Sequence, residues 1–293
     1  MLKRMLIAAA AFAALSGPAV AQEAINPALY AVRDADSTLY LYGTIHVRPT
    51  GSDWADDDVR RALGETQEIW TELLMTPETE AQTQQLALQL GRAAPGRPLS
   101  SFLDADENAR LNALTGRLGM PAGALEGFQP WLAGLTLAIV PALQAGYSPT
   151  SGVDRNVDVF GDANGKAMRA LETVEQQLGF FTNLSEEAQR QFLVESIDQA
   201  DAGVQLLNQM TAAWERGDDE TLERLVIEET RREYPEMYQA IFVQRNNAWM
   251  EVLVRELQGS GVDFVAVGAG HLIGDDGLVE QFRARGFTVE RVG

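Results

Sequence analysis

The chain has 293 residues, no cysteine, and 42 acidic against 23 basic residues, so its formal net charge is −19. A protein this acidic gains neither counterion release from nucleic acid nor attraction to anionic lipid, which argues against both as partners. Without disulfides, the fold must be stabilised by its core, and about 270 residues are enough to form one.

The first 21 residues are expected to be a cleavable signal peptide. Lys3 and Arg4 precede an apolar run over residues 5–15 that is too short to span a bilayer, and small residues at 19 and 21 form a cleavage site. We therefore expect cleavage after Ala21, one mature domain over residues 22–293, and a periplasmic or secreted location. A retained N-terminal anchor is the alternative. No transmembrane segment is expected after cleavage, because no later run reaches the ~20 apolar residues that a span needs.

The elements expected in chain order place strands near both ends and helices between them. They are a hairpin (27–33 and 38–43), a helix (54–63), a strand (67–74), helices (77–90, 105–118, 121–127, 130–145 and 154–163) and a strand (166–171). Residues 172–178 then lead back into helices (185–216, 218–232 and one or two over 235–258), followed by a strand (262–267), a helix (275–285) and a strand (287–292). Ser52 and Asp53 are expected to cap the first helix, and Asp104 with Glu107 to form a capping box. The order predicts an α/β (α+β) fold: a mixed sheet built from N- and C-terminal strands, flanked by helices, with a largely helical middle region.

The only two histidines of the chain end matched motifs. In each motif an apolar, strand-like run finishes in Gly-x-x-His: Gly43 precedes His46, and Gly268 precedes His271. Each glycine permits a tight turn or a close backbone approach just past the strand. Because ligands collect at the carboxyl edge of open α/β sheets, we expect both imidazoles to lie near each other at that edge. Two unrelated core histidines are the alternative.

Glu72 is the unusual residue of the strand expected over 67–74. Its carboxylate lies among Trp70, Leu73 and Leu74. A carboxylate at a largely buried strand end needs a cationic or metallic partner. An exposed position on an edge strand is the alternative.

These residues allow three kinds of function. Two neutral imidazoles and a carboxylate can hold a divalent ion with open positions, which lowers the pKa of bound water and polarises a carbonyl. A metal-independent hydrolase would instead use one histidine as general base, Glu72 to orient it or activate water, and Arg245 to stabilise an oxyanion. A non-catalytic binding protein for haem, metal or peptide is the third possibility. The motifs of serine hydrolases, dinucleotide oxidoreductases and helix-borne metalloproteases are absent.

An ordered set of motifs resembles the TraB/GumN family over nearly the whole mature chain. The motifs are Gly43-Thr44-Ile45-His46, Glu72-Leu73, Pro130-Trp131, Gly152-Val153-Asp154, Gly165-Lys166, Leu171-Glu172-Thr173, Glu175-Gln176-Gln177-Leu178, Arg245-Asn246, and Val267-Gly268-Ala269-Gly270-His271-Leu272. No single motif is specific, whereas their common order is.

The resemblance implies an α/β fold related to the Tiki metalloproteases and, more distantly, to erythromycin-esterase-like hydrolases. It implies a divalent-metal-dependent hydrolase, most of all a peptidase, that acts on a peptide or small-molecule substrate with manganese, cobalt or zinc. Unlike the Tiki proteins, this chain is expected to be exported without a C-terminal membrane anchor. Carried over by motif, His46, His271 and Glu72 correspond to metal ligands, and Glu72 and Arg245 to catalytic residues. The positions that correspond to supporting residues are Gly43, Gly268, Asp154 and Glu172.

Overall fold

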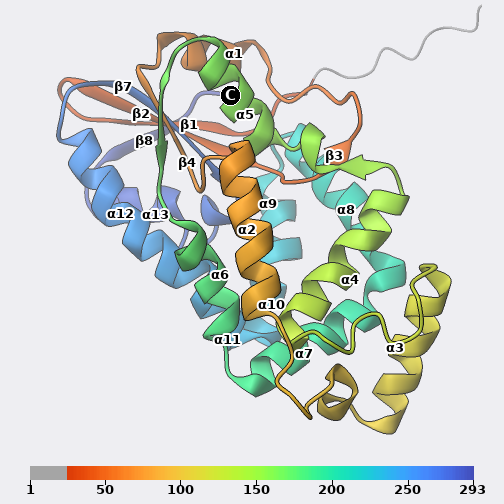
Figure 1. Ribbon diagram of the computed structural model, residues 1–293. Helices are drawn as coiled ribbons and strands as arrows, with labels where there is room; N and C mark the ends of the chain where they lie inside the picture. Colours follow the sequence, from red (N-terminus) through yellow and green to blue (C-terminus); the bar gives the residue numbers. More distant parts are fainter. Residues whose placement is uncertain (1–24) are drawn as a thin grey trace, which may run out of the picture.

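The computed structural model describes residues 25–293 and shows a strand-rich half beside a helical half (Figure 1). The signal peptide expected over residues 1–21 lies outside the described residues, so its cleavage and the location of the protein stay predictions. The strands are β1 (Leu29–Arg33), β2 (Ser37–Thr44), β3 (Arg48–Pro49), β4 (Glu68–Thr71), β5 (Tyr147–Ser148), β6 (Ala167–Ala170), β7 (Gly261–Gly268) and β8 (Thr288–Arg291).

The main sheet has six strands in the order β6-β4-β7-β2-β1-β8, and β3 pairs with β5 in a separate ribbon. β6, β4, β7 and β2 run parallel, whereas β1 is antiparallel to both β2 and β8. The first and last strands of the chain are therefore neighbours, and β7 lies between β4 and β2. This topology confirms the predicted α/β fold with a mixed sheet built from N- and C-terminal strands.

Helices cover both sides of this sheet. α1 (Asp57–Glu65) and α5 (Val153–Ala163) lie on one side of it in Figure 1, and α12 (Gln244–Leu257) and α13 (Leu278–Ala284) lie on the other. The central strands are consequently buried on both faces: Leu39, Leu41, Phe264, Val265 and Val267 are all at most 1% exposed. A strand covered on both faces has a continuous apolar sequence and not an alternating one.

The helical half has its own core, to which Leu99, Leu111, Leu137 and Leu193 contribute. Its helices are α2 (Pro77–Leu90), α3 (Ala105–Arg117), α4 (Pro130–Gln144), α6 (Val174–Thr182), α7 (Glu186–Asp198), α8 (Ala200–Glu215), α9 (Asp219–Leu222), α10 (Glu229–Glu233) and α11 (Pro235–Tyr238). Two segments are π-helical, η3 (Glu223–Glu228) and η4 (Gln239–Val243), and short 3₁₀ turns occur at η1 (Leu99–Phe102), η2 (Pro149–Ser151) and η5 (Ala269–His271). Over residues 25–293, no helix combines the length and apolarity needed to cross a membrane.

Three local predictions are wrong. The N-cap of α1 is Asp56, whose side chain accepts from the third helical N–H, and not Ser52 or Asp53, so this helix starts three residues late. The segment over 121–127 consists of turns, because Gly123 has a φ of +71° that an α-helix cannot contain. The single helix expected over 185–216 is two helices, α7 and α8, which meet at Gln199.

Candidate functional site

Four neighbouring parallel strands each bring one polar side chain to the carboxyl edge of the sheet. In the spatial order of the strands, Glu172 follows β6, Glu72 follows β4, His271 follows β7 and His46 follows β2. β2 and β7 pair with their last residues aligned, so the two Gly-x-x-His segments leave the sheet side by side. The edge at which ligands collect in open α/β folds therefore carries two imidazoles and two carboxylates.

Arg245 of α12 connects three of these four side chains. Its Nε donates to Glu172 Oε1 (2.8 Å), its Nη2 to Glu72 Oε2 (2.6 Å) and Glu172 Oε2 (3.0 Å), and its Nη1 lies 3.0 Å from His271 Nε2. Trp249, one turn later on the helix, donates from Nε1 to Glu172 (2.9 Å), and its ring centroid lies 4.7 Å from the guanidinium carbon. All these residues are buried, so the guanidinium is the centre of a closed polar network.

The guanidinium and burial act in opposite directions on the two carboxylates. Burial raises the pKa of Glu72, but the charge of Arg245 and the hydrogen bond from Gly268 help to hold that pKa well below its usual range. For Glu172, burial is the stronger effect and its pKa is raised, although Arg245 opposes the change. Burial lowers the pKa of Arg245, but attraction to the two carboxylates together outweighs it and raises that pKa. Arg245 and Glu72 therefore form the firmly charged pair.

Asn246 fixes the position of the proton on His271. Nδ2 of Asn246 donates to the backbone carbonyls of Asp276 (2.9 Å) and His271 (3.3 Å), so its Oδ1 is the acceptor for His271 Nδ1 (2.7 Å). The neutral ring then carries its lone pair on Nε2, where Arg245 donates. Burial, together with the charge of Arg245, lowers the pKa of His271 to about 3. His271 is thus a neutral acceptor inside the network.

His46 is the exposed imidazole at this edge. Its side chain is 62% exposed, and its Nδ1 lies 3.2 Å from Oδ2 of Asp154, the second residue of α5. The Asp154 carboxylate raises the pKa of His46 above its usual 6.5, to about 9. When neutral, His46 donates from Nδ1 to Asp154 and carries its lone pair on Nε2. The two residues form an oriented imidazole–carboxylate pair.

Close backbone contacts hold the His46 segment in place. A Cβ added at Gly152, the N-cap of α5, would lie 2.4 Å from the backbone oxygen of His46. A Cβ added at Gly43 would lie 3.0 Å from Cα and Cβ of Ala269 in η5. The carbonyl of Gly43 accepts a hydrogen bond from Nε1 of Trp214 (2.7 Å). Residue 152 therefore has no room for a side chain, and residue 43 has room only if Ala269 shifts slightly.

The side chains of His46, Glu72 and His271 converge beside Gly268. A Cβ added at Gly268 would lie 3.2 Å from Glu72 Oε1, 3.5 Å from His271 Cδ2 and 3.7 Å from His46 Nε2. The Gly268 N–H donates to Glu72 Oε1 (2.7 Å). The glycine therefore orients the carboxylate and leaves open the space that the three side chains share.

The structure brings together every residue that the sequence assigned to the site. They are Gly43, His46, Glu72, Asp154, Glu172, Arg245, Gly268 and His271. Their individual roles stay predictions.

The chemistry of these donors suits a divalent ion, but their arrangement does not. Two imidazoles and a carboxylate are suitable ligands. Within residues 25–293, however, no group of three His, Cys, Asp or Glu side chains is placed to hold a metal ion. Arg245 accounts for this, since it donates to the Nε2 lone pair of His271 that a metal would need and already neutralises Glu72. In this arrangement the guanidinium already occupies two of the three expected ligands.

Two residues of the network, Asn246 and Trp249, were not among the predicted site residues. Together with Arg245 they occupy positions i, i+1 and i+4 of α12, and all three side chains are buried. The sequence does contain a signal that could have identified Asn246: an Arg-Asn pair lies within the apolar stripe of an amphipathic helix. Polar residues buried in such a stripe need hydrogen-bond partners.

A cavity of about 480 Å³ adjoins the network between α6, η4 and α12. Glu172 and Trp249 form part of its wall, together with Phe180 and with amide side chains such as Gln176 and Gln239. A ligand there would touch the carboxylate that Arg245 holds. The cavity therefore lies next to the polar edge of the sheet.

Comparison with protein-family models matches residues 28–291 to the TraB/PrgY/gumN family. The comparisons with curated proteins and with solved structures gave no match. The match covers nearly the whole described part of the chain, including every residue of the polar edge. This chain belongs to the TraB/PrgY/gumN family.

Proposed function

We propose that this chain is a hydrolase in which His46 acts as general base toward water. The observation that carries the proposal is the His46–Asp154 pair: an exposed imidazole whose Nδ1 meets a carboxylate at 3.2 Å. Its Nε2 faces the space beside Gly268. An imidazole oriented in this way is a typical general base, and such a base contributes roughly 10²–10⁴-fold to a rate.

The proposed reaction is hydrolysis of an ester or peptide carbonyl. His46 Nε2 takes a proton from water as the water oxygen attacks the carbonyl carbon, and the imidazolium then returns that proton to the leaving group. Asp154 holds the Nδ1 proton and stabilises the imidazolium. The Nη1 group of Arg245 has two N–H bonds, and the one hydrogen bond it forms within residues 25–293 is to His271. The second N–H can donate to the developing oxyanion.

The direct test is turnover of fluorogenic peptides and p-nitrophenyl esters by the purified chain. We expect His46→Ala to lower kcat/KM by about 10²-fold or more and Asp154→Asn by about tenfold. Asp162→Asn is the matched control, because Asp162 is an exposed acid on the same helix. Equal activity in the wild type and His46→Ala would remove His46 from the chemistry, and absence of turnover of every substrate would favour a binding protein.

A metal-dependent peptidase is the second candidate, favoured by the convergence of His46, Glu72 and His271 beside Gly268. These three side chains would be the ligands, and a bound ion would activate water. Arg245 would first have to release His271 Nε2. Full activity in the presence of a chelator would argue against the metal-dependent peptidase. Activity that appears only with added manganese, cobalt or zinc would support it and argue against the metal-independent hydrolase. In either case we propose that the chain acts outside the cytoplasm, because its first 21 residues are expected to be a signal peptide.

A further inference from the structure

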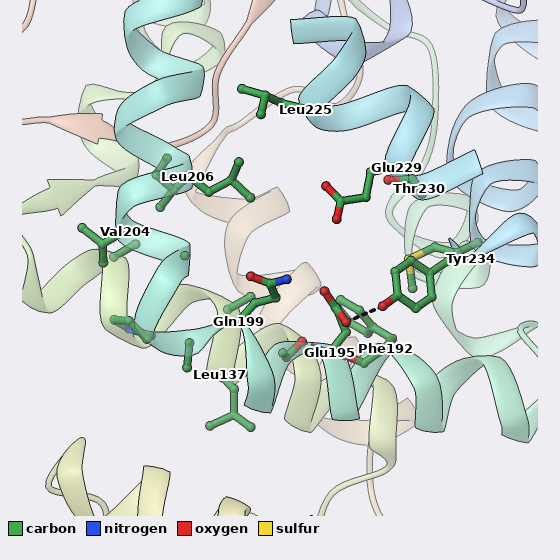
Figure 2. A pocket seen from close by; sticks show the side chains of 18 residues that line it. Leu137, Phe192, Glu195, Gln199, Val204, Leu206, Leu225, Glu229, Thr230 and Tyr234 are labelled. Carbon is green, nitrogen blue, oxygen red and sulfur yellow. Dashed lines mark hydrogen bonds between the residues drawn. The ribbon is translucent and has the colours of Figure 1, made fainter. Parts of the chain in front are cut away.

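A second cavity lies in the helical half of the molecule. It has a volume of about 320 Å³ and lies between α4, α7, α8 and the segment from η3 to α10 (Figure 2). Cavities that bind small molecules begin at roughly this size. None of the described residues that line it belongs to the network around Arg245, so the proposed hydrolysis gives this cavity no role.

Most of the wall of this cavity is apolar, and several helices contribute to it. Leu137 comes from α4, Phe192 from α7, Leu206 from α8 and Leu225 from the π-helical segment η3. Figure 2 shows Leu206 and Leu225 beside one central space, with Leu137 at its lower end. A hydrocarbon group gains free energy when it moves from water into such a space, at about 25 cal/mol per Å² of apolar surface.

Two carboxylates face the same space. Figure 2 shows Glu195 of α7 and Glu229 of α10 pointing into it from different helices. The Tyr234 hydroxyl donates to Oε2 of Glu195, which leaves Oε1 available. Among the described residues that line the cavity there is no Lys, Arg or His. Glu195 is half-buried and Glu229 is exposed. Two negative charges at one cavity, with no basic residue in its described wall, favour a positively charged ligand.

The local backbone supports a binding role for this wall. η3 is π-helical and leads directly into α10, and Leu225 and Glu229 both line the cavity from these two elements. Single π-helical turns are uncommon and occur frequently at functional sites.

We infer that this cavity binds an organic cation that has an apolar body and an ammonium group. The hydrocarbon body lies between Leu137, Leu206 and Leu225. The ammonium group lies between the carboxylates of Glu195 and Glu229 and donates to both, because its three N–H bonds can serve two carboxylates at once.

The test is isothermal titration of the full chain with octylamine, octanol and octanoate, which share an apolar body and differ in charge. We expect saturable binding of one octylamine per chain, at least about tenfold tighter than octanol, a difference of about 1.4 kcal/mol. A salt concentration of about 0.15 M screens attraction of the amine to the acidic surface in general. Equal affinity for octanol or octanoate, or no binding of octylamine, would overturn the inference.

Variants locate the binding. Gly203 lines the cavity, and a Cβ added there meets no atom within 4 Å, so Gly203→Leu adds an apolar side chain at the cavity wall without a clash at Cβ. We expect this variant to lose octylamine binding and to keep its thermal stability, since leucine is also a better helix former. Glu195→Gln with Glu229→Gln should weaken binding at least about tenfold. The matched control, Glu228→Gln, changes an exposed neighbour outside the wall and should bind normally. Binding that persists in Gly203→Leu would show that the amine binds elsewhere.

Discussion

At the scale of single residues, Arg245 is the residue on which the buried network depends. Its replacement by Ala leaves Glu72 and Glu172 buried without a positive charge. We expect Arg245→Ala to lower the free energy of unfolding by about 3–5 kcal/mol, the usual cost of breaking a buried ion pair from one side. Urea denaturation followed by circular dichroism measures this. Arg255→Ala, at an exposed position of the same helix, should stay within about 0.5 kcal/mol of the wild type, and equal losses in both variants would contradict the network's role.

The pH dependence of turnover tests His46 at the same scale. A general base must be unprotonated, and Asp154 raises the pKa of His46 from 6.5 to about 9. We therefore expect kcat/KM to rise with pH on a limb displaced above 6.5, toward 9. In Asp154→Asn the limb should move back toward about 6.5, because the charge that stabilises the imidazolium is gone. A limb that stays in place in this variant would mean that another group titrates.

At the scale of elements, glycines decide how closely the His46 segment approaches α5. A methyl group at Gly152 would lie 2.4 Å from the His46 carbonyl oxygen, so the loop or the helix must shift. We expect Gly152→Ala to cost about 1–3 kcal/mol of stability and to lower turnover further, because His46 moves with the loop. The contrasting change is Gly116→Ala in α3, where a Cβ meets open space. That variant should gain about 0.5–1 kcal/mol, as measured by thermal unfolding.

The strands and the Gly-x-x-His motifs could be predicted because their signals are local. A short apolar run bounded by glycine identifies β2 and β7, and the capping box of Asp104 and Glu107 was found where it was expected. The start of α1 could not be chosen in the same way, since Ser52, Asp53 and Asp56 are all good capping residues in one short segment. Tertiary contacts decide among such candidates, and they are not visible in the local sequence.

The site was predictable as a set of residues but not as an arrangement. Matched motifs placed His46 and His271 at one sheet edge, and the parallel pairing of β2 with β7 brings them there. Nothing in the spacing along the chain indicates that Arg245 donates to Nε2 of His271 or that Asn246 fixes the ring proton. The expected two-histidine, one-carboxylate metal centre therefore omitted Arg245, which donates to His271 and Glu72.

At the scale of the whole molecule, the polar edge of the sheet exists only when distant parts of the chain combine. In the sequence, His46 lies near the N-terminus, Glu172 near the middle and His271 near the C-terminus. Each lies at the end of one parallel strand, so the sheet must be complete before the edge is. Such non-local pairing has to overcome loop-closure entropy before contacts form, and this type of sheet folds slowly.

Two C-terminal truncations test this dependence. Ending the chain at residue 260 removes β7, which lies between β4 and β2 in the centre of the sheet, together with His271. Ending it at residue 286 removes only β8, an edge strand that pairs with β1 alone. We expect the shorter chain to lose cooperative urea unfolding, because β4 and β2 lose the strand that joins them and the apolar residues of β7 no longer fill the core. The longer chain should unfold cooperatively at a lower urea concentration and keep turnover, since every residue of the polar edge is present. A cooperative transition in the chain that ends at 260, followed by circular dichroism and tryptophan fluorescence together, would show that the helical half folds without the sheet.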